Sequence, residues 1–297
     1  MTLNASGCLD ALTAPDVARQ LDAFVTKTVT PLPREGNAPE RIAETGAGML
    51  NSIGLANPGI DRFVDEVLPR LLELGPPVWV SVGGFSAAEY GDLCARLDDT
   101  GAAAVELNLS CPNVAEPEDE ATSIVAAARA ATSKPLYAKL SPALPDIPAV
   151  ALAAAAAGAD GLSLVNTIRG MALDPRTLRP RLATGTGGLS GPALRPVALA
   201  AVHACYRATG LPIVGMGGVE TGADALELIA VGASAVALGT VLFADPGAPA
   251  RIRRELATEA ASRGFAEPSA AHGIALDSVA SPADALAKQK EQVGLKV

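Results

Sequence analysis

Short apolar runs rich in Val, Ile and Leu alternate along the chain with longer stretches in which Ala and Leu recur at helical spacing. Because the runs are apolar throughout, they predict strands that are covered on both faces, as in a parallel sheet. The predicted strands are Leu3–Ala5, Phe24–Thr30, Val78–Val82, Val105–Leu109, Leu136–Leu140, Gly161–Val165, Pro212–Gly215 and Ala235–Leu238. The predicted helices are Pro15–Asp22, Asp61–Leu74, Ser86–Asp99, Asp119–Ala131, Ile147–Ala157, Pro192–Thr209, Ala223–Val231 and Pro249–Arg263.

Eight strand-then-helix units of this kind indicate an α/β fold, a (β/α)8 TIM barrel, and an open doubly wound sheet is the alternative. We expect a single domain over residues 1–297, with residues 264–297 as a C-terminal appendage. The segment Thr30–Gly59 is rich in Pro and Gly and is expected to be an irregular loop. Ser86 followed by Glu89 predicts a capping box at one helix start.

Polar residues follow or interrupt the predicted strands, at the end of a barrel where active sites lie. The chain has six lysines, and two of them, Lys27 and Lys139, lie inside apolar strand sequence. A buried ammonium needs an anion or a hydrogen-bond partner. These lysines therefore indicate either internal ion pairs with carboxylates or an anionic cofactor or substrate at the barrel mouth.

Glycine and asparagine residues are also expected at this end of the barrel, which we call the rim. The glycines at 215, 217, 218 and 239 end the last two strands, each ahead of a helix, and predict a phosphate site there, tight turns being the alternative. Asparagine side chains donate and accept hydrogen bonds, so a group of them suits a planar ring such as a pyrimidine or a flavin. The five that fall on expected loops or strand ends are Asn51, Asn57, Asn108, Asn113 and Asn166.

Cys111 lies among polar residues just after a strand and is a candidate nucleophile or general base. The other three cysteines are expected to be inert, and no cysteine spacing predicts a metal or iron–sulfur site. The acidic run of residues 116–120 is expected to open a helix and to bind no metal. Both histidines fall away from the strand ends, which disfavours a Ser-His-Asp hydrolase.

Composition narrows the class of protein further. The chain has 297 residues, is 49% hydrophobic and carries a formal net charge of −9. Such acidity disfavours general binding to nucleic acid or to anionic membranes. With no signal peptide or membrane-spanning stretch in the sequence, we expect a cytoplasmic protein.

The strand-end segments resemble the class 1 dihydroorotate dehydrogenases. The most specific segment is Asn-Leu-Ser-Cys-Pro-Asn, which begins at Asn108; Asn-Thr-Ile-Arg-Gly-Met from Asn166 and Gly-Gly-Leu-Ser-Gly-Pro from Gly187 look most like class 1B, the NAD-linked type. The resemblance implies a flavoprotein that binds FMN and oxidises dihydroorotate to orotate in pyrimidine (UMP) biosynthesis.

The same resemblance implies roles for individual residues. Cys111 would be the base that takes a proton from dihydroorotate, and Lys27 would lie between flavin and substrate. Residues expected to hold dihydroorotate or orotate are Asn51, Ile53, Gly54, Leu55, Asn108, Asn113, Asn166 and Thr167. Residues expected to contact FMN are Ser6, Lys27, Lys139, Val165, Gly191, Gly217, Gly218, Gly239 and Thr240.

The resemblance to class 1B enzymes also implies partners. These are an electron-transfer subunit, which carries FAD and a 2Fe–2S cluster and reduces NAD, and a second copy of the catalytic subunit in a homodimeric core. The segment after Val114 is shorter than the glycine-rich loop of the family. Two alternatives therefore stay open: another FMN barrel oxidoreductase, such as a dihydropyrimidine dehydrogenase-like enzyme or a specialised-metabolism paralogue, or a flavin-binding barrel without turnover.

Overall fold

The computed structural model describes residues 1–109 and 117–276. Eight strands form one parallel sheet in the order β1-β12-β11-β8-β7-β6-β5-β2. Their bounds are Thr2–Asn4 (β1), Phe24–Val25 (β2), Val78–Val82 (β5), Ala104–Asn108 (β6), Leu136–Leu140 (β7), Gly161–Leu164 (β8), Ile213–Met216 (β11) and Ala235–Leu238 (β12).

The first and last strands of this order meet, because a parallel bridge joins Leu3 to Ala23 directly ahead of β2. The sheet therefore curls into a barrel and is not an open doubly wound sheet. This confirms the TIM-barrel prediction, and each predicted strand matches one observed strand.

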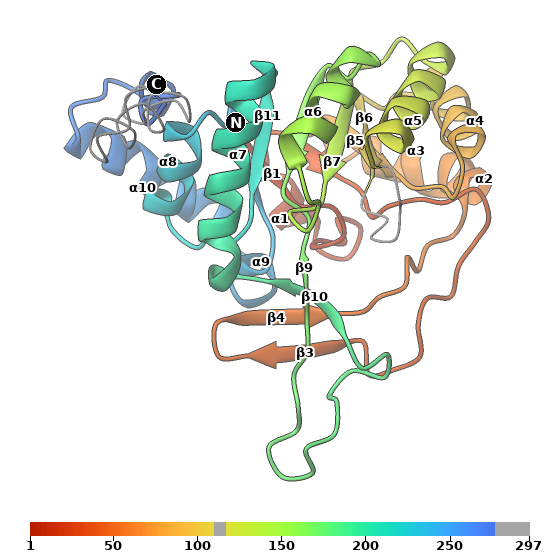
Figure 1. Ribbon diagram of the computed structural model, residues 1–297, viewed down its shortest axis with the longest axis horizontal. Coiled ribbons are helices and arrows are strands. Elements are labelled where there is room, and N and C mark those ends of the chain that lie inside the picture. The colour runs from red at the N-terminus through yellow and green to blue at the C-terminus, as the bar shows by residue number, and fades with distance from the viewer. Residues whose placement is uncertain (110–116, 277–297) are drawn as a thin grey trace, which may run out of the picture.

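Helices cover the outside of the barrel (Figure 1). Their bounds are Pro15–Ala18 (α1), Ile60–Arg62 (α2), Leu68–Leu72 (α3), Ala87–Asp98 (α4), Pro117–Ala131 (α5), Ile147–Ala156 (α6), Arg195–Thr209 (α7), Gly222–Ala230 (α8), Val241–Ala244 (α9) and Ala248–Ser262 (α10). A π-helical segment, Phe63–Val67, joins α2 to α3 just ahead of Pro69, which has no N–H for a regular turn. Short 3₁₀ helices cover Pro192–Leu194 and Pro268–Ala271.

The helix starts show how local sequence sets the boundaries. Ser86 accepts a hydrogen bond from the Glu89 amide, as predicted, but the Glu89 carboxylate accepts from the Phe85 amide and so does not close a capping box. A complete capping box occurs instead at Thr221 and Asp224, at the start of α8. Both arrangements satisfy amides that the first helical turn leaves free.

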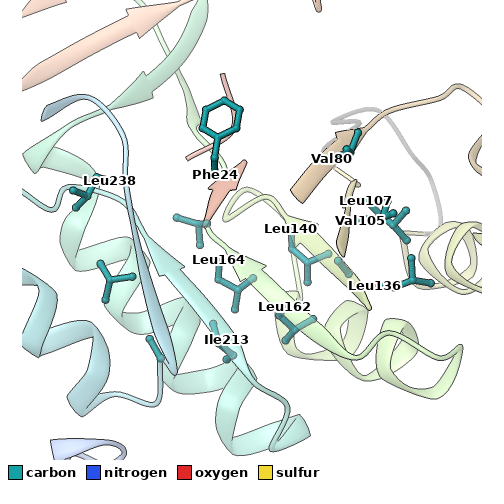
Figure 2. Close-up of a cluster of buried hydrophobic side chains, with 14 of the residues drawn as sticks. Phe24, Val80, Val105, Leu107, Leu136, Leu140, Leu162, Leu164, Ile213 and Leu238 are labelled. Atoms are coloured by element: carbon teal, nitrogen blue, oxygen red, sulfur yellow. The ribbon is translucent and has the colours of Figure 1, made fainter. Parts of the chain in front are cut away.

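The main hydrophobic core lies between the strands and the helices. Figure 2 shows side chains of this layer, including Leu107 of β6, Leu140 of β7 and Leu164 of β8, each fully buried. A second cluster fills the inside of the barrel, where the rings of Trp79 and Tyr137 lie 4.5 Å apart. The barrel is thus packed through most of its length, so a ligand must bind at its mouth.

The strand predicted over Phe24–Thr30 is interrupted. The Thr26 amide donates to the Trp79 carbonyl and the Val29 amide donates to the Ser81 carbonyl, so the first strand advances three residues where its partner advances two. The extra residue forms a bulge next to Lys27. Bulges bend a strand and re-aim its side chains, and this one lies at the carboxyl end of the barrel.

The prediction of an irregular loop over Thr30–Gly59 is wrong. The segment contains a hairpin, β3 (Ile42–Thr45) and β4 (Gly48–Asn51), which pairs with β10 (Gly187–Ser190) and through it with β9 (Ile168–Gly170). The resulting four-stranded antiparallel sheet stands off one end of the barrel, and the connection from β9 to β10 projects farthest (Figure 1). Residues from two distant parts of the chain therefore meet above the barrel mouth.

The described part of the region after Arg263 packs on the barrel. Ala271 is buried, and the amides of Gly273 and Ala275 donate to the carbonyls of Ile229 and Ala230 at the end of α8. Residues 277–297 lie outside the described part of the chain. Within residues 1–109 and 117–276, no helix combines the length and the apolar character that crossing a membrane requires.

Candidate functional site

A cavity of about 870 Å³ opens at the carboxyl ends of the barrel strands, between the barrel and the four-stranded sheet. Its volume lies in the upper part of the roughly 300–1,000 Å³ range of ligand pockets. Sixteen residues that the family resemblance predicts as cofactor or substrate residues line it: Ser6, Lys27, Asn51, Ile53, Gly54, Leu55, Asn108, Lys139, Val165, Asn166, Thr167, Gly191, Gly217, Gly218, Gly239 and Thr240. Gly215, also expected near a phosphate, does not line it. Cys111 and Asn113 lie outside the described residues.

Lys27 reaches the cavity from the bulge after β2. A Cβ atom on Gly7, which has a φ of +80°, would lie only 3.0 Å from Cδ of Lys27, so this close approach favours glycine. Burial lowers the pKa of the Lys27 ammonium, and the positive charge of Lys139 lowers it further. Among residues 1–109 and 117–276, no carboxylate lies within ion-pair distance of Lys27, so its charge faces the cavity unpaired.

Lys139 is held differently. It lies in the regular ladder of β7, is 5% exposed, and its Nζ lies 3.6 Å from Oε1 of Glu106 on the neighbouring strand β6. The internal ion pair, one of the two interpretations of a lysine in apolar sequence, is therefore present here. Lys139 nevertheless also lines the cavity, so the pair lies at the cavity floor.

Amide side chains form a network over the cavity wall. Asn166 donates from Nδ2 to Oδ1 of Asn108 at 3.2 Å, and Asn108 donates from Nδ2 to Oγ1 of Thr28 at 3.4 Å. Oδ1 of Asn166 accepts from the Thr167 amide at 2.8 Å. These bonds fix the orientation of both amides on the cavity wall, which suits the recognition of a planar ligand.

Two of the predicted asparagines, Asn51 and Asn57, lie in or after the β3–β4 hairpin, and only Asn51 lines the cavity. Asn51, at the end of β4, lines the cavity and donates to the Gly188 carbonyl of β10. Asn57 is not part of the rim: it accepts from the Thr30 amide and donates to the Thr30 hydroxyl, which holds the loop in place. The inclusion of Asn57 among the rim asparagines was therefore wrong, and it is a turn residue.

The glycine-rich end of the cavity is formed by the loops after β11 and β12. Gly218 has a φ of +78°, and a Cβ there would lie 2.8 Å from Cβ of Arg195, so no larger residue fits. Next to it, the Thr240 hydroxyl donates to Oγ of Ser190 at 2.8 Å. Exposed backbone and hydroxyl groups of this kind suit an anion such as a phosphate.

The structure adds cavity residues that were not predicted. Thr28 and Ser190 supply hydroxyls, Met49 supplies an apolar wall and Arg169 a cation, while Cys8, expected to be inert, also lines the cavity. Burial raises the pKa of the Cys8 thiol. Ser190 and Arg169 lie in the segments that carried the family resemblance. The strands that contain them, β10 and β9 respectively, were not predicted from the sequence.

The described part of the acidic run lies at the start of α5. Glu118, Asp119 and Glu120 lie in the first turn of α5, where carboxylates favour the positive end of the helix dipole. This confirms that the run opens a helix.

Comparison with known proteins decides the family. The family model described as dihydroorotate dehydrogenase matches residues 2–259. The chain belongs to the dihydroorotate dehydrogenase family. The resemblance noted from the strand-end motifs is thereby confirmed.

Individual members of the dihydroorotate dehydrogenase family are close relatives. A protein of Desulforudis audaxviator (strain MP104C) is 50% identical over 245 residues, which are 80% of each chain, and one of Latilactobacillus sakei is 48% identical over 252 residues, 81% of this chain and 82% of its own. Both are named dihydroorotate dehydrogenase B (NAD(+)), catalytic subunit. The crystal structure of a dihydroorotate dehydrogenase from Eimeria tenella in complex with ferulenol superimposes with a TM-score of 0.77 at 25% identity, over 92% of this chain and 84% of its own.

Proposed function

We propose that this protein is the FMN-binding catalytic subunit of an NAD-linked dihydroorotate dehydrogenase, which oxidises dihydroorotate to orotate in pyrimidine biosynthesis. The observation that carries the proposal is the cavity itself. Sixteen predicted cofactor and substrate residues, spread from Ser6 to Thr240, converge on it. The relatives named as catalytic subunits of dihydroorotate dehydrogenase B, at 45–50% identity, support the same reaction.

The cavity fits FMN in size and in chemistry. The glycine-rich end, with Gly217, Gly218, Gly239 and Thr240, would hold the phosphate, and Lys139 and Ser6 would contact the flavin ring system. A Cβ at Gly218 would collide with Arg195, so packing and a left-handed φ both favour glycine in this loop and leave its backbone exposed to the cavity. Bound FMN would supply a hydride acceptor.

The amide groups of Asn51, Asn108 and Asn166 would orient the substrate. Asn166 already donates a hydrogen bond to Asn108, so the two amides would meet the ring of dihydroorotate in a fixed orientation. The ammonium of Lys27, with which no described carboxylate pairs, would offset the negative charge of the substrate carboxylate, of the phosphate or of the cofactor. A single cation can thus serve more than one anion at the cavity mouth.

Cys111 would act as the base. Its thiolate would take the proton from C5 of dihydroorotate while a hydride leaves C6 for the flavin, so that the substrate loses two electrons and two hydrogens and a C5–C6 double bond forms. A thiol with an ordinary pKa of about 8.5 serves this purpose near neutral pH if a nearby cation lowers its pKa modestly.

The two electrons removed from dihydroorotate would need a further acceptor. The proposed acceptor is NAD, reached through a partner subunit that carries FAD and a 2Fe–2S cluster, and the names of the relatives support it because they specify both NAD and a catalytic subunit. We further propose a homodimeric catalytic core and a cytoplasmic location.

The decisive experiment mixes the purified protein anaerobically with dihydroorotate and follows flavin absorbance. We expect a yellow protein that releases FMN on denaturation and is bleached by dihydroorotate. A protein that stays colourless when FMN is added would overturn the proposal, and a yellow protein that dihydroorotate fails to bleach would point to another substrate of an FMN barrel oxidoreductase.

The Cys111→Ala variant tests the base. We expect it to bind FMN normally but to be bleached at least about 100-fold more slowly at neutral pH, within the usual contribution of a general base. Cys205→Ala, at a buried thiol in α7, is the matched control and should be bleached at the wild-type rate. Wild-type bleaching in Cys111→Ala would show that Cys111 is not the base.

A further inference from the structure

Glu106 is a buried carboxylate that the reaction scheme above does not use. It lies on β6, is 1% exposed, and its Oε1 atom has no hydrogen-bond partner among the described residues. Its contact with charge is the ammonium of Lys139, 3.6 Å away on β7. Burying a carboxylate without hydrogen bonds is costly, and a packed apolar residue at this position would avoid that cost.

The position of Glu106 relative to the cavity suggests what it does. Lys139 lines the cavity, whereas Glu106 does not and lies one step farther down the barrel, because Tyr137 is the register partner of Glu106 and Lys139 is that of Asn108. Glu106 therefore does not touch a ligand in the cavity. It reaches such a ligand through Lys139.

The charges around Lys139 differ in sign. Glu106 faces it from β6, the Lys27 ammonium faces it from the bulge after β2, and the Cys8 thiol faces it from the loop after β1, while Tyr137 lies on its own strand. Lys139 lowers the pKa of Lys27, so the two ammoniums repel each other. Glu106 is the group that compensates one of these two positive charges, so the two lysines and Glu106 together contribute a single net positive charge.

We propose that Glu106 is a positioning residue that holds the Lys139 ammonium at the cavity floor, balances its charge, and thereby lowers the reduction potential of the bound flavin. This inference rests on the proposed function, since it requires FMN in the cavity next to Lys139. Reduction adds negative charge to a flavin, so an uncompensated cation next to it favours the reduced state. The carboxylate beneath Lys139 opposes this and keeps the electrons easier to pass on.

The proposal predicts the direction of the change. In the variant Glu106→Gln, Lys139 loses its counter-charge, so the cavity floor has one more net positive charge than in the wild-type protein. The bound flavin should therefore be easier to reduce.

The test measures the FMN reduction potential of the FMN-loaded protein at neutral pH. Glu106→Gln should increase the ratio of reduced to oxidised flavin at a fixed applied potential about tenfold, equivalent to about +30 mV for a two-electron couple. A flavin-loaded Glu106→Gln with the wild-type potential would overturn the proposal.

The Lys139→Met background shows whether Glu106 acts through Lys139. Adding Glu106→Gln to Lys139→Met should shift the potential clearly less than Glu106→Gln does alone, because no ammonium remains to be positioned, and a shift as large as in the single variant would overturn the positioning role. If Glu106→Gln does not fold, Glu106→Asp retracts the carboxylate by one methylene group and should raise the potential by less than tenfold in the same ratio; no shift there would also contradict the proposal. Failure to bind FMN in the wild-type protein would instead overturn the proposed function.

Discussion

The strands β2 and β7 each bring one lysine to the same cavity, and they do so in opposite ways. Lys139 lies in the unbroken ladder of β7, where regular pairing places it next to Glu106 of β6. Lys27 follows β2 at a bulge, where the ladder is interrupted and no described carboxylate is within ion-pair distance. The same residue type in equally apolar sequence is thus neutralised in one strand and left charged toward the ligand in the other.

This difference separates two tasks. A paired lysine contributes a hydrogen-bond donor with little net charge, whereas an unpaired one contributes a full charge at the cost of burial. The bulge makes the second possible because it turns the backbone away from the neighbouring strands. Substitution of Lys139 on β7 should therefore affect mainly stability, whereas substitution of Lys27 after β2 should affect mainly activity.

The largest effect is expected from Lys139→Met. It leaves the Glu106 carboxylate buried without a counter-charge, so the free energy of unfolding should fall by about 3–5 kcal/mol in denaturant titrations. Adding Glu106→Gln should recover most of that loss, because both members of the pair are then neutral. If the double variant is as unstable as the single one, the pair does not explain the stability of β7.

Lys27→Met should behave in the opposite manner. Because the substitution breaks no ion pair of the described residues, the free energy of unfolding should change little, whereas loss of a charge at the cavity should slow flavin reduction by dihydroorotate about 100-fold. Lys134→Met is the matched control, since Nζ of Lys134 donates to the Thr100 carbonyl and Lys134 does not line the cavity. Equal rates in the Lys27 and Lys134 variants would remove the distinction between the two strands.

Gly7→Ala tests the close approach that positions Lys27. A left-handed backbone and a contact of 3.0 Å to Lys27 should together cost about 1–2 kcal/mol of stability, measured by thermal or chemical unfolding. Gly46→Ala is the control, because nothing lies within 4 Å of a Cβ built there and its φ is not left-handed. If both variants are equally stable, Gly7 does not constrain Lys27.

The antiparallel sheet was the part of the fold that sequence patterns missed. Its strands β9 and β10 contain glycines, which weaken strand propensity, and β10 pairs with a hairpin more than 130 residues earlier. A Cβ at Gly188 would lie 2.1 Å from Oγ1 of Thr167, so glycine is required there by packing. This packing requirement on Gly188 is apparent only in the folded structure, where segments distant in sequence lie side by side.

The candidate site was predictable to a greater extent than this sheet. Lys27, Asn108 and Asn166 follow directly from their places at strand ends, because all parallel strands of a barrel end on one side. Asn57 was misjudged because position on a loop does not reveal whether an amide points at a ligand or at its own backbone. The hydrogen bonds of the Asn57 side chain to the amide and hydroxyl of Thr30 show that it holds its own loop in place.

Local pattern alone determined the eight strand-and-helix units and the identity of the polar residues at their ends, since apolar periodicity and helix stop signals act over a few residues. The tertiary structure was needed for the bulge beside Lys27, for the pairing of Lys139 with Glu106, and for the sheet that roofs the cavity. These depend on the register between strands and on contacts across more than a hundred residues, which no local pattern specifies.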